Sequence, residues 1–230
     1  MSRTVVVTGT GTDVGKTVAV AALAAAVRAA GAEVALCKPL QTGLAPGEAG
    51  DVDVAARLAG VDRTLEIRRL PDPLAPETAA RLAGEAQPRL DELVGPVRGF
   101  AAGADVTLVE GAGGVLVRLG TDLTVLDLAA GLNAPLVVVT RAGLGTLNDS
   151  ELAVRAVRDA GLRCAGLVVG SLPPEPDLAT RCNLDDLPRL CGVPVLGAVP
   201  AGAGAMEPAD FAAAAPGWFG AGVARVLGAP

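Results

Sequence analysis

The sequence predicts an α/β fold in which helices cover both faces of a mostly parallel central sheet. Short β-branched runs alternate along the 230 residues with longer runs rich in Ala and Leu, as in repeated strand–helix–strand units. Hydrophobic residues make up 51% of the chain but aromatic residues only 2%, so Ala, Val and Leu must build the core. Such a core suits helices packed on a buried parallel sheet.

Six runs have the length and composition of buried strands. They cover residues 4–9, 33–38, 105–111, 135–140, 164–170 and 194–200, and a seventh strand is possible around 67–70. Parallel strands joined by right-handed crossovers end along one edge of the sheet. The glycine- and proline-rich loops that follow these strands should meet at that edge, where ligands of such sheets bind.

Helices are predicted between the strands by runs with helical periodicity. They cover residues 16–31, 51–60, 76–84, 88–102 and 147–161, with a last helical stretch at 207–228 that breaks at Pro216. Gly31 and Gly60 are placed to end the first two helices.

The apolar stretch 123–140 is too interrupted to span a membrane. Asp127 and Pro135 divide it into a helix and a strand, and no uncharged run has the length that a bilayer requires. We find no secretory signal, internal repeat or linker. We therefore expect a single cytoplasmic domain over residues 1–230 that does not bind a membrane.

Charge and cysteine content narrow the classes of function. The net charge of −6 argues against non-specific nucleic-acid binding, which needs a basic face. Cys37, Cys164, Cys182 and Cys191 include no C-x2-C pair, which disfavours a zinc or iron–sulfur site. We expect four reduced, buried thiols, as in cytoplasmic proteins.

The segment GTGTDVGKT, residues 9–17, joins a predicted strand to a predicted helix. Its glycines permit tight turns whose N–H groups can surround phosphate oxygens, and the helix N-terminus favours an anion. Lys16 would reach the β- and γ-phosphates, and Thr17 would bind Mg²⁺. The spacing varies from G-x4-G-K-[ST], because five residues separate Gly9 from Gly15. A phosphate-binding loop at this position predicts a P-loop NTPase-like fold. The alternative is a glycine-rich turn that binds no ligand.

Lysine occurs at only two positions. Of the 19 Lys and Arg residues, Lys16 and Lys38 are the lysines, so 17 are arginine. A lysine ammonium is a compact charge, whereas arginine is a planar fork. Lys38, which begins KPLQTG after the second strand, is therefore a candidate for chemistry beside Lys16. The alternative is a strand-end lysine whose head reaches solvent.

Two carboxylates are candidates to bind the metal of a Mg²⁺–nucleotide complex. Glu110 lies at the end of the strand 105–111, a position typical of nucleotide hydrolases, although it could also be a solvated turn residue. Asp51 follows a flexible loop at a helix start, where it could bind metal or cap the helix. We expect Asp53 to be solvated.

Four motifs resemble those of the dethiobiotin synthetase family over nearly the whole chain. They are VTGTGTDVGKT, CKPLQTG, VEGAGG and GTLN, in this order. The resemblance implies a C–N bond-forming ligase of biotin biosynthesis that converts 7,8-diaminononanoate, CO2 and ATP into dethiobiotin, ADP and phosphate, with Mg²⁺. A carbamate of one amine would attack the γ-phosphate. The second amine would then close the ring and expel phosphate.

The resemblance also implies residue roles. Lys16 and Lys38 are the catalytic residues, and Thr17, Asp51 and Glu110 are the metal ligands. The substrate-binding residues are Thr12, Thr42, Gly145, Thr146, Leu147 and Asn148. The nucleotide-binding residues are Asp13, Val14, Gly15, Lys16, Thr17, Val18, Asp51, Glu110, Gly111, Ala112, Gly113, Gly170, Ser171, Pro200, Ala201 and Gly202. Because this reaction crowds several anions together, a compact ammonium at residue 38 could follow the charge as it moves.

Two further expectations concern recognition. The helix start at GTLN offers N–H groups to the substrate carboxylate, and in the family this segment comes from the other subunit of a homodimer. A plain helix cap by Thr146 or Asn148 is the alternative. Family members often have Asn where this chain has Gly170, so base contacts would rely on backbone atoms and nucleotide choice would be relaxed.

Three other functions share parts of this pattern. Synthetase-like domains of cobyrinic acid biosynthesis usually carry a glutaminase domain with a nucleophilic Cys and a His, and this sequence contains no histidine. Partitioning or cell-division ATPases usually place an extra lysine early in the phosphate loop, where this chain has Gly9, Thr10 and Gly11. A non-enzymatic nucleotide-binding module would not need the second lysine loop at residue 38.

Overall fold

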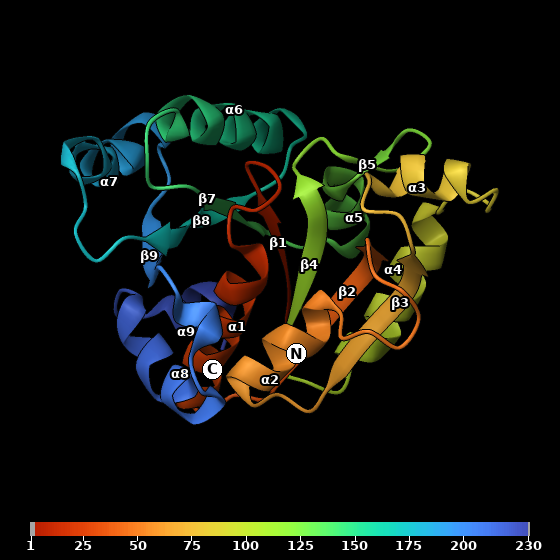
Figure 1. Ribbon diagram of the computed structural model, residues 1–230, viewed down its shortest axis with the longest axis horizontal. Helices are drawn as coiled ribbons and strands as arrows, with labels where there is room; N and C mark the ends of the chain where they lie inside the picture. Colours follow the sequence, from red (N-terminus) through yellow and green to blue (C-terminus); the bar gives the residue numbers. More distant parts are fainter. Residues whose placement is uncertain (1–2, 230) are drawn as a thin grey trace.

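A seven-stranded sheet forms the centre of the computed structural model, which describes residues 3–229 (Figure 1). The strands are β1 (Arg3–Gly9), β2 (Val34–Thr42), β3 (Thr64–Leu70), β4 (Val106–Gly114), β7 (Leu136–Thr140), β8 (Cys164–Leu172) and β9 (Val195–Pro200). Their order is β3-β2-β4-β1-β7-β8-β9, and every neighbouring pair is parallel. The predicted parallel sheet is confirmed, and the uncertain strand around 67–70 is β3.

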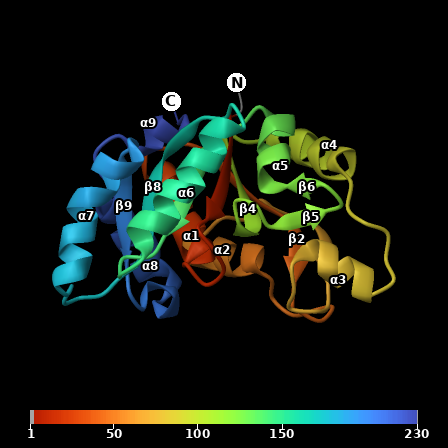
Figure 2. The same cartoon turned by 90° about the horizontal axis from the view of Figure 1, so that it is seen from above.

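Helices cover both faces of the sheet, as Figure 2 shows from above. They are α1 (Lys16–Ala29), α2 (Asp51–Ala59), α3 (Pro76–Leu82), α4 (Leu90–Ala101), α5 (Val125–Leu132), α6 (Thr146–Asp159), α7 (Leu178–Cys191), α8 (Pro208–Ala214) and α9 (Val223–Leu227). Side chains of α1, α2, α8 and α9 share one apolar core with the sheet, and those of α4 to α7 share the core on the other face. The predicted P-loop NTPase-like architecture of two helical layers on one sheet is confirmed.

Three parts of the chain differ from the prediction. Helix α7 lies in a segment for which we predicted no element. A small antiparallel hairpin, β5 (Arg118–Gly120) and β6 (Leu123–Thr124), follows β4. The C-terminal stretch is three short pieces, because a 3₁₀ turn at Ala215–Trp218 separates α8 from α9. Its predicted break at Pro216 is confirmed.

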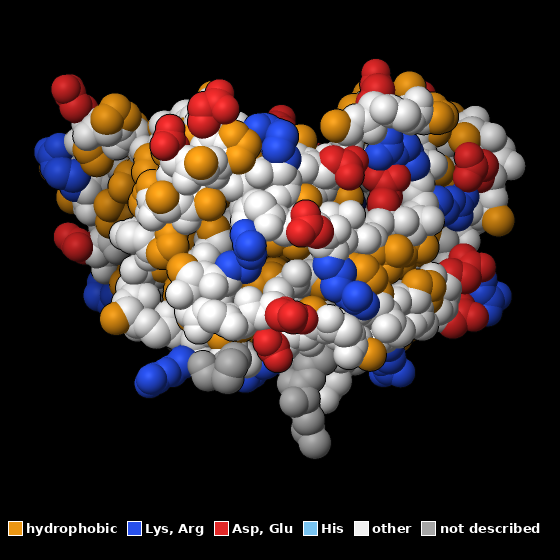
Figure 3. All heavy atoms as spheres, turned by 90° about the horizontal axis from the view of Figure 1, so that it is seen from below, with side chains coloured by type: hydrophobic (Ala, Val, Ile, Leu, Met, Phe, Trp, Pro, Cys, Tyr) orange, Lys and Arg blue, Asp and Glu red, His pale blue; other side chains and the backbone are white. Residues whose placement is uncertain are grey.

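Charges of both signs are distributed over the surface. Figure 3 shows the molecule from below, and acidic and basic side chains are interspersed on this face. Within residues 3–229, no helix combines the length and apolar character that crossing a bilayer requires.

The four cysteines are unpaired thiols, but they differ in exposure. Cys37 and Cys191 are buried, Cys164 is half-buried and Cys182 on α7 is exposed, so the expectation of four buried thiols is wrong for Cys182. Burial raises the pKa of Cys37 from 9.0 to about 12. An unfolded chain therefore releases this proton at lower pH than the folded chain does, and the thiol's contribution to stability falls as the pH rises through this range.

We expect native protein at about pH 8 to be alkylated at Cys182 much faster than at Cys37, because reaction needs an exposed thiolate. Peptide mass spectrometry after timed iodoacetamide treatment measures both rates, and labelling in denaturant gives the reference. Equal native rates at the two residues would contradict the burial of Cys37.

Candidate functional site

The loop after β1 meets the carboxyl ends of β2 and β4. In Figure 1 it lies between α6 and the arrowhead of β4. Asp13 and Gly15 adopt left-handed backbone conformations, with φ of 56° and 90°. Helix α1 then begins after Gly15 without a side-chain cap. The N–H groups of its first turn are thus not used by a capping side chain, which is the arrangement that binds phosphate.

Strand register brings Lys38 and Glu110 together. Val34 and Leu36 on β2, like Val106 and Leu108 on β4, belong to the core beneath α1. The two strands pair in parallel with Cys37 opposite Val109. The next residue of each strand faces α1 again, because side chains alternate in a strand. Lys38 Nζ accordingly lies 2.7 Å from Glu110 Oε1, and both side chains are buried.

Asp51 reaches the same ammonium from the first residue of α2. Its Oδ2 lies 2.7 Å from Lys38 Nζ. Gly50 is the N-cap of α2, and Asp53 Oδ2 accepts a 2.8 Å hydrogen bond from the Gly50 N–H. The alternative that Asp51 caps this helix is therefore wrong. Asp53 is exposed, as expected, and its carboxylate also caps the helix start.

Opposing electrostatic effects act on the two lysines. Burial disfavours the charged form of Lys38, but the attraction of Glu110 and Asp51 outweighs burial and raises its pKa. For Lys16, burial is the largest effect and lowers the pKa, although Glu110 partly opposes it. The Lys16 ammonium donates a 2.8 Å hydrogen bond to the Gly11 carbonyl oxygen. Lys38 is therefore held as a cation, whereas Lys16 loses its charge more readily.

The oxygens beside Lys38 fit a magnesium ion. Thr17 Oγ1 lies 3.1 Å from Glu110 Oε1, and Glu110 Oε2 is buried with no hydrogen-bond partner among residues 3–229. No group of three His, Cys, Asp or Glu side chains within residues 3–229 could hold a metal by itself. Mg²⁺ commonly uses one or two carboxylates and takes its other ligands from phosphate and water. A hydroxyl and two carboxylates suit that mode of binding.

A pocket of about 840 Å³ opens over these groups. The predicted site residues that line it are Thr12, Asp13, Gly15, Lys16, Thr17, Val18, Lys38, Thr42, Asp51, Glu110, Ala112 and Gly113. The end of β2 and the segment leading into α3, including Leu74 and Pro76, form the rest of the wall. One cavity thus contains both lysines, the three candidate metal ligands and an apolar wall.

The segment Gly145–Asn148 does not line this pocket. Helix α6 begins after Gly145 without a side-chain cap, so neither Thr146 nor Asn148 caps it. The Thr146 hydroxyl is buried, donates to the Arg141 carbonyl oxygen at 2.6 Å and lies 2.7 Å from the Thr140 hydroxyl. Thr146 therefore uses its side chain to hold the loop, and a ligand at this helix start would meet backbone groups.

The residues predicted to contact the base lie on the other side of the phosphate loop. A Cβ atom on Gly170 would lie 1.9 Å from the Val14 carbonyl oxygen, and one on Gly15 would lie 2.5 Å from the Gly170 carbonyl oxygen. Val14 and Gly111 are buried and do not line the pocket. Ser171, Pro200, Ala201 and Gly202 are exposed. Gly170 therefore supports the phosphate loop by direct backbone contact.

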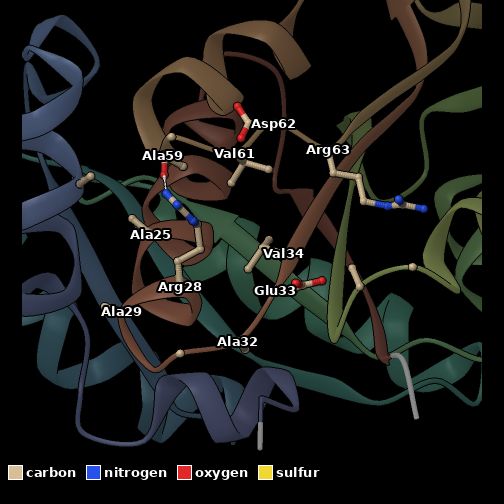
Figure 4. Close-up of a pocket in the computed structure, with 15 residues that line it drawn as sticks. Ala25, Arg28, Ala29, Ala32, Glu33, Val34, Ala59, Val61, Asp62 and Arg63 are labelled. Atoms are coloured by element: carbon tan, nitrogen blue, oxygen red, sulfur yellow. Dashed lines mark hydrogen bonds between the residues drawn. The ribbon is translucent and has the colours of Figure 1, made fainter.

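A second hollow, of about 610 Å³, lies where α1 ends and β2 begins. Figure 4 shows Arg28 directed at the Ala59 carbonyl oxygen and Arg63 pointing away from Arg28. The Arg28 hydrogen bond measures 2.6 Å, and Arg63 stacks on the Phe100 ring. None of the residues that line this hollow is a predicted site residue. The two guanidinium groups do not converge on a shared position.

Three supporting residues were not found from the sequence. Gln41 Oε1 accepts a hydrogen bond of 2.9 Å from the Asp51 N–H. Asn183 on α7 donates to the carbonyl oxygens of Ala142 and Gly143, at 2.9 and 3.0 Å. Arg69 holds the loop before Asp51. Gln41 lies within KPLQTG, so its position in a motif was a usable signal, whereas the other two contacts depend on tertiary structure.

Known proteins resemble this chain in sequence over most of its length. A family model described as an AAA domain matches residues 3–209. An ATP-dependent dethiobiotin synthetase BioD from Rhodococcus jostii is 59% identical over 215 residues, which cover 93% of each chain. A protein of the same name from Streptomyces coelicolor is 55% identical over 93% of this chain and 90% of its own.

Solved structures resemble the chain in fold. The septum site-determining protein MinD from Pyrococcus horikoshii, in complex with Mg-ADP, has a TM-score of 0.61 and 15% identity over 99% of this chain and 95% of its own. The cell division ATPase MinD from Pyrococcus furiosus has a TM-score of 0.57 and 19% identity, covering 99% and 98%. At such identities the likeness describes the fold alone.

Proposed function

Because this chain belongs to the family of ATP-dependent dethiobiotin synthetases, we propose that the pocket containing Lys16 and Lys38 is its active site. The chain is an ATP- and Mg²⁺-dependent ligase that carboxylates 7,8-diaminononanoate with CO2 and closes the ring to dethiobiotin, releasing ADP and phosphate. The observation that carries the site assignment is the position of the Lys38 ammonium, 2.7 Å from both Asp51 and Glu110.

Lys16 and the phosphate loop bind the triphosphate in this proposal. The first turn of α1 supplies N–H groups, and the backbone of Asp13 to Val18 surrounds the anion. Lys16 donates to the Gly11 carbonyl oxygen and would exchange this contact for phosphate oxygens of a bound nucleotide. Its partial desolvation strengthens that attraction, since charges interact more strongly away from water.

Thr17, Asp51 and Glu110 would hold Mg²⁺, which neutralises charge on the transferring phosphoryl group. Lys38 neutralises Asp51 and Glu110. Its ammonium also lines the pocket, where it would attract substrate anions. The buried position of Lys38 makes that charge effective for a carbamate or a departing phosphate.

Proton removal from the substrate amines cannot involve histidine, because the sequence contains none. Phosphate oxygens, water, carboxylates or the second amine remain as bases. Most of the rate enhancement therefore comes from positioning and from charge stabilisation. Thr12 and Thr42, which line the same pocket, would orient the diamine.

The substrate carboxylate would bind at the start of α6 in a second copy of the chain. Gly145 to Asn148 lie outside the pocket of their own chain, yet α6 begins there without a side-chain cap. Leu144 beside this segment is 89% exposed, which suits an apolar contact between copies. A homodimer would thus complete each site. The single domain over residues 1–230 and a cytoplasmic location are part of the same proposal.

Phosphate release from ATP tests the activity. We expect release to require both diaminononanoate and bicarbonate, with one dethiobiotin formed per phosphate by mass spectrometry. Replacing the diamine with a monoamine of the same chain length is the control, because a carbamate can form but the ring cannot close. Hydrolysis at an unchanged rate without the diamine would instead indicate a nucleotide switch.

Relaxed nucleotide choice is expected because backbone atoms, and no amide side chain, occupy the predicted base site at Gly170 and Ser171. The ratio of kcat/KM for ATP to that for CTP or GTP should stay below about 10³, since larger ratios need a dedicated buried hydrogen bond. Steady-state rates with each nucleotide at saturating diamine measure it. A preference for ATP above that ratio would reject the backbone-only account.

A further inference from the structure

We propose that the Arg69–Glu66 ion pair of β3 is a positioning device for Asp51. It fixes the loop of residues 44–50, called here the 44–50 loop, so that α2 begins with the Asp51 carboxylate at Lys38. The inference rests on the proposed role of Asp51 in the active site. Arg69 itself does not line the pocket that contains the two lysines.

The guanidinium of Arg69 joins two parts of the chain. Its Nε and Nη2 each donate to a different oxygen of Glu66, both at 2.7 Å. Its Nη1 donates to the carbonyl oxygens of Ala45 and Glu48 at 3.0 and 2.5 Å. Glu48 Oε2 in turn accepts from the Ala45 N–H at 2.8 Å. One planar fork therefore fixes the strand and both ends of the turn in the 44–50 loop.

Gly50, the residue before Asp51, packs directly against this ion pair. It is buried, with an ordinary extended backbone at φ −83°. A Cβ atom there would lie 2.8 Å from Glu66 Oε2 and 2.9 Å from Arg69 Nη2. A side chain at residue 50 would therefore displace the ion pair, which lies directly against the backbone. The next N–H, of Asp51, is bound to Gln41.

Asp51 depends on this support more than Glu110 does. Glu110 extends from a central strand and its side chain is 4% exposed, whereas that of Asp51 is 37% exposed. The outer side of the 44–50 loop borders a hollow of about 790 Å³ and not packed core. The contacts to Arg69, Asp53 and Gln41 are therefore what hold the start of α2.

The neighbouring ion pair provides a matched control. Arg68 and Glu85 are also 2.7 Å apart, and Arg68 precedes Arg69 on the same strand. No contact of Arg68 or Glu85 with Gly50 or Asp51 is found within residues 3–229. We therefore compare Arg69→Met/Glu66→Gln with Arg68→Met/Glu85→Gln. Removing both charges of a pair avoids leaving a half-buried or exposed carboxylate without its partner.

We expect the Arg69→Met/Glu66→Gln variant to need about tenfold more Mg²⁺ to bind ADP than the wild type does. An effect of this size is typical when a group that orients a metal ligand is lost. Calorimetric titration of ADP at a series of Mg²⁺ concentrations measures this without turnover. Saturating Mg²⁺ should restore most of kcat. The Arg68/Glu85 variant should titrate like the wild type, and thermal unfolding of both variants reports any general loss of stability.

Two further measurements test the 44–50 loop itself. Cleavage by a glutamate-specific protease after Glu48, identified by mass spectrometry, should accelerate in the Arg69/Glu66 variant only. In the wild type, Gly50→Ala should raise the Mg²⁺ concentration needed for ADP binding. In the Arg69→Met/Glu66→Gln variant the same substitution should raise it less, because the Arg69 guanidinium beside the added Cβ is gone.

An unchanged Mg²⁺ titration in the Arg69/Glu66 variant, or equal shifts in both variants, would overturn the proposal. Unchanged cleavage after Glu48 would also overturn it. These binding and cleavage results do not depend on dethiobiotin formation. A chain that binds Mg–ADP and shows the expected shifts but forms no dethiobiotin would contradict the proposed function and leave the positioning role supported.

Discussion

Lys38→Arg is expected to lower kcat about as much as Lys38→Ala does, by about 10²- to 10³-fold, the usual effect of removing one preorganised stabilising group. A single nitrogen of Lys38 contacts Asp51, Glu110 and the Gly111 carbonyl oxygen, and the residue is only 4% exposed. A longer, planar guanidinium cannot place its charge at that point without displacing a carboxylate. Steady-state phosphate release with diamine and bicarbonate measures the change.

Two controls accompany the Lys38 variants. Nucleotide binding, measured by calorimetry, should remain, because Lys16 and the phosphate loop are untouched. Thermal unfolding should show whether Lys38→Ala suffers from the two carboxylates that it leaves unpaired. A Lys38→Arg protein with near-normal turnover would show that any positive charge suffices, and the requirement for a compact ammonium would then be wrong.

Gly170→Ala is expected to lower kcat/KM for ATP by about 10²-fold, since an error of about 1 Å in the placement of reacting groups has effects of that size. The added Cβ would lie 1.9 Å from the Val14 carbonyl oxygen, so the phosphate loop must shift. The backbone of Gly170 is outside the left-handed region, so the effect is one of space. Initial rates over a range of ATP concentrations measure it.

Gly99→Ala on α4 serves as the matched control, because within residues 3–229 its added Cβ would meet nothing within 4 Å beyond its own helix and chain neighbours. Gly170→Asn should be at least as impaired as Gly170→Ala. The amide that the family resemblance leads us to expect at this position therefore would not improve base recognition in this chain. Wild-type kcat/KM in Gly170→Ala would mean that the loop moves freely, contrary to the close packing of Val14 and Gly15 on Gly170.

The sequence was sufficient to predict that Lys38 and Glu110 lie close together. It was not sufficient to predict which residues hold Asp51 beside them. Lys38 and Glu110 were predictable because each follows a mostly apolar run typical of a buried strand, and parallel strands carry such residues toward the same edge of a sheet. Asp51 was ambiguous, because a carboxylate at a helix start can cap or bind metal. Only the three-dimensional structure excludes the capping role, because Asp51 contacts Lys38 and Asp53 accepts from the N-cap N–H. Metal binding by Asp51 stays a prediction.

Helix α7 was missed although two of its boundary signals are visible. Asp177 caps its start by accepting from the Thr180 N–H at 2.7 Å, and Gly192 ends it in a left-handed conformation. Pro188 lies within it, and an internal proline counts against a helix when the sequence alone is considered. The hairpin of β5 and β6 was missed because strands of three and two residues have no measurable period.

The hydroxyl groups of Thr140, Thr146 and Ser150 form one buried cluster, and Asn183 secures the same turn from α7. The turn between β7 and α6 is thereby rigid before any partner or ligand arrives. Its loss of conformational entropy occurs during folding, so a carboxylate that docks there need not order it. Mutations on α7, well outside the lysine pocket, could then weaken substrate affinity by loosening this turn.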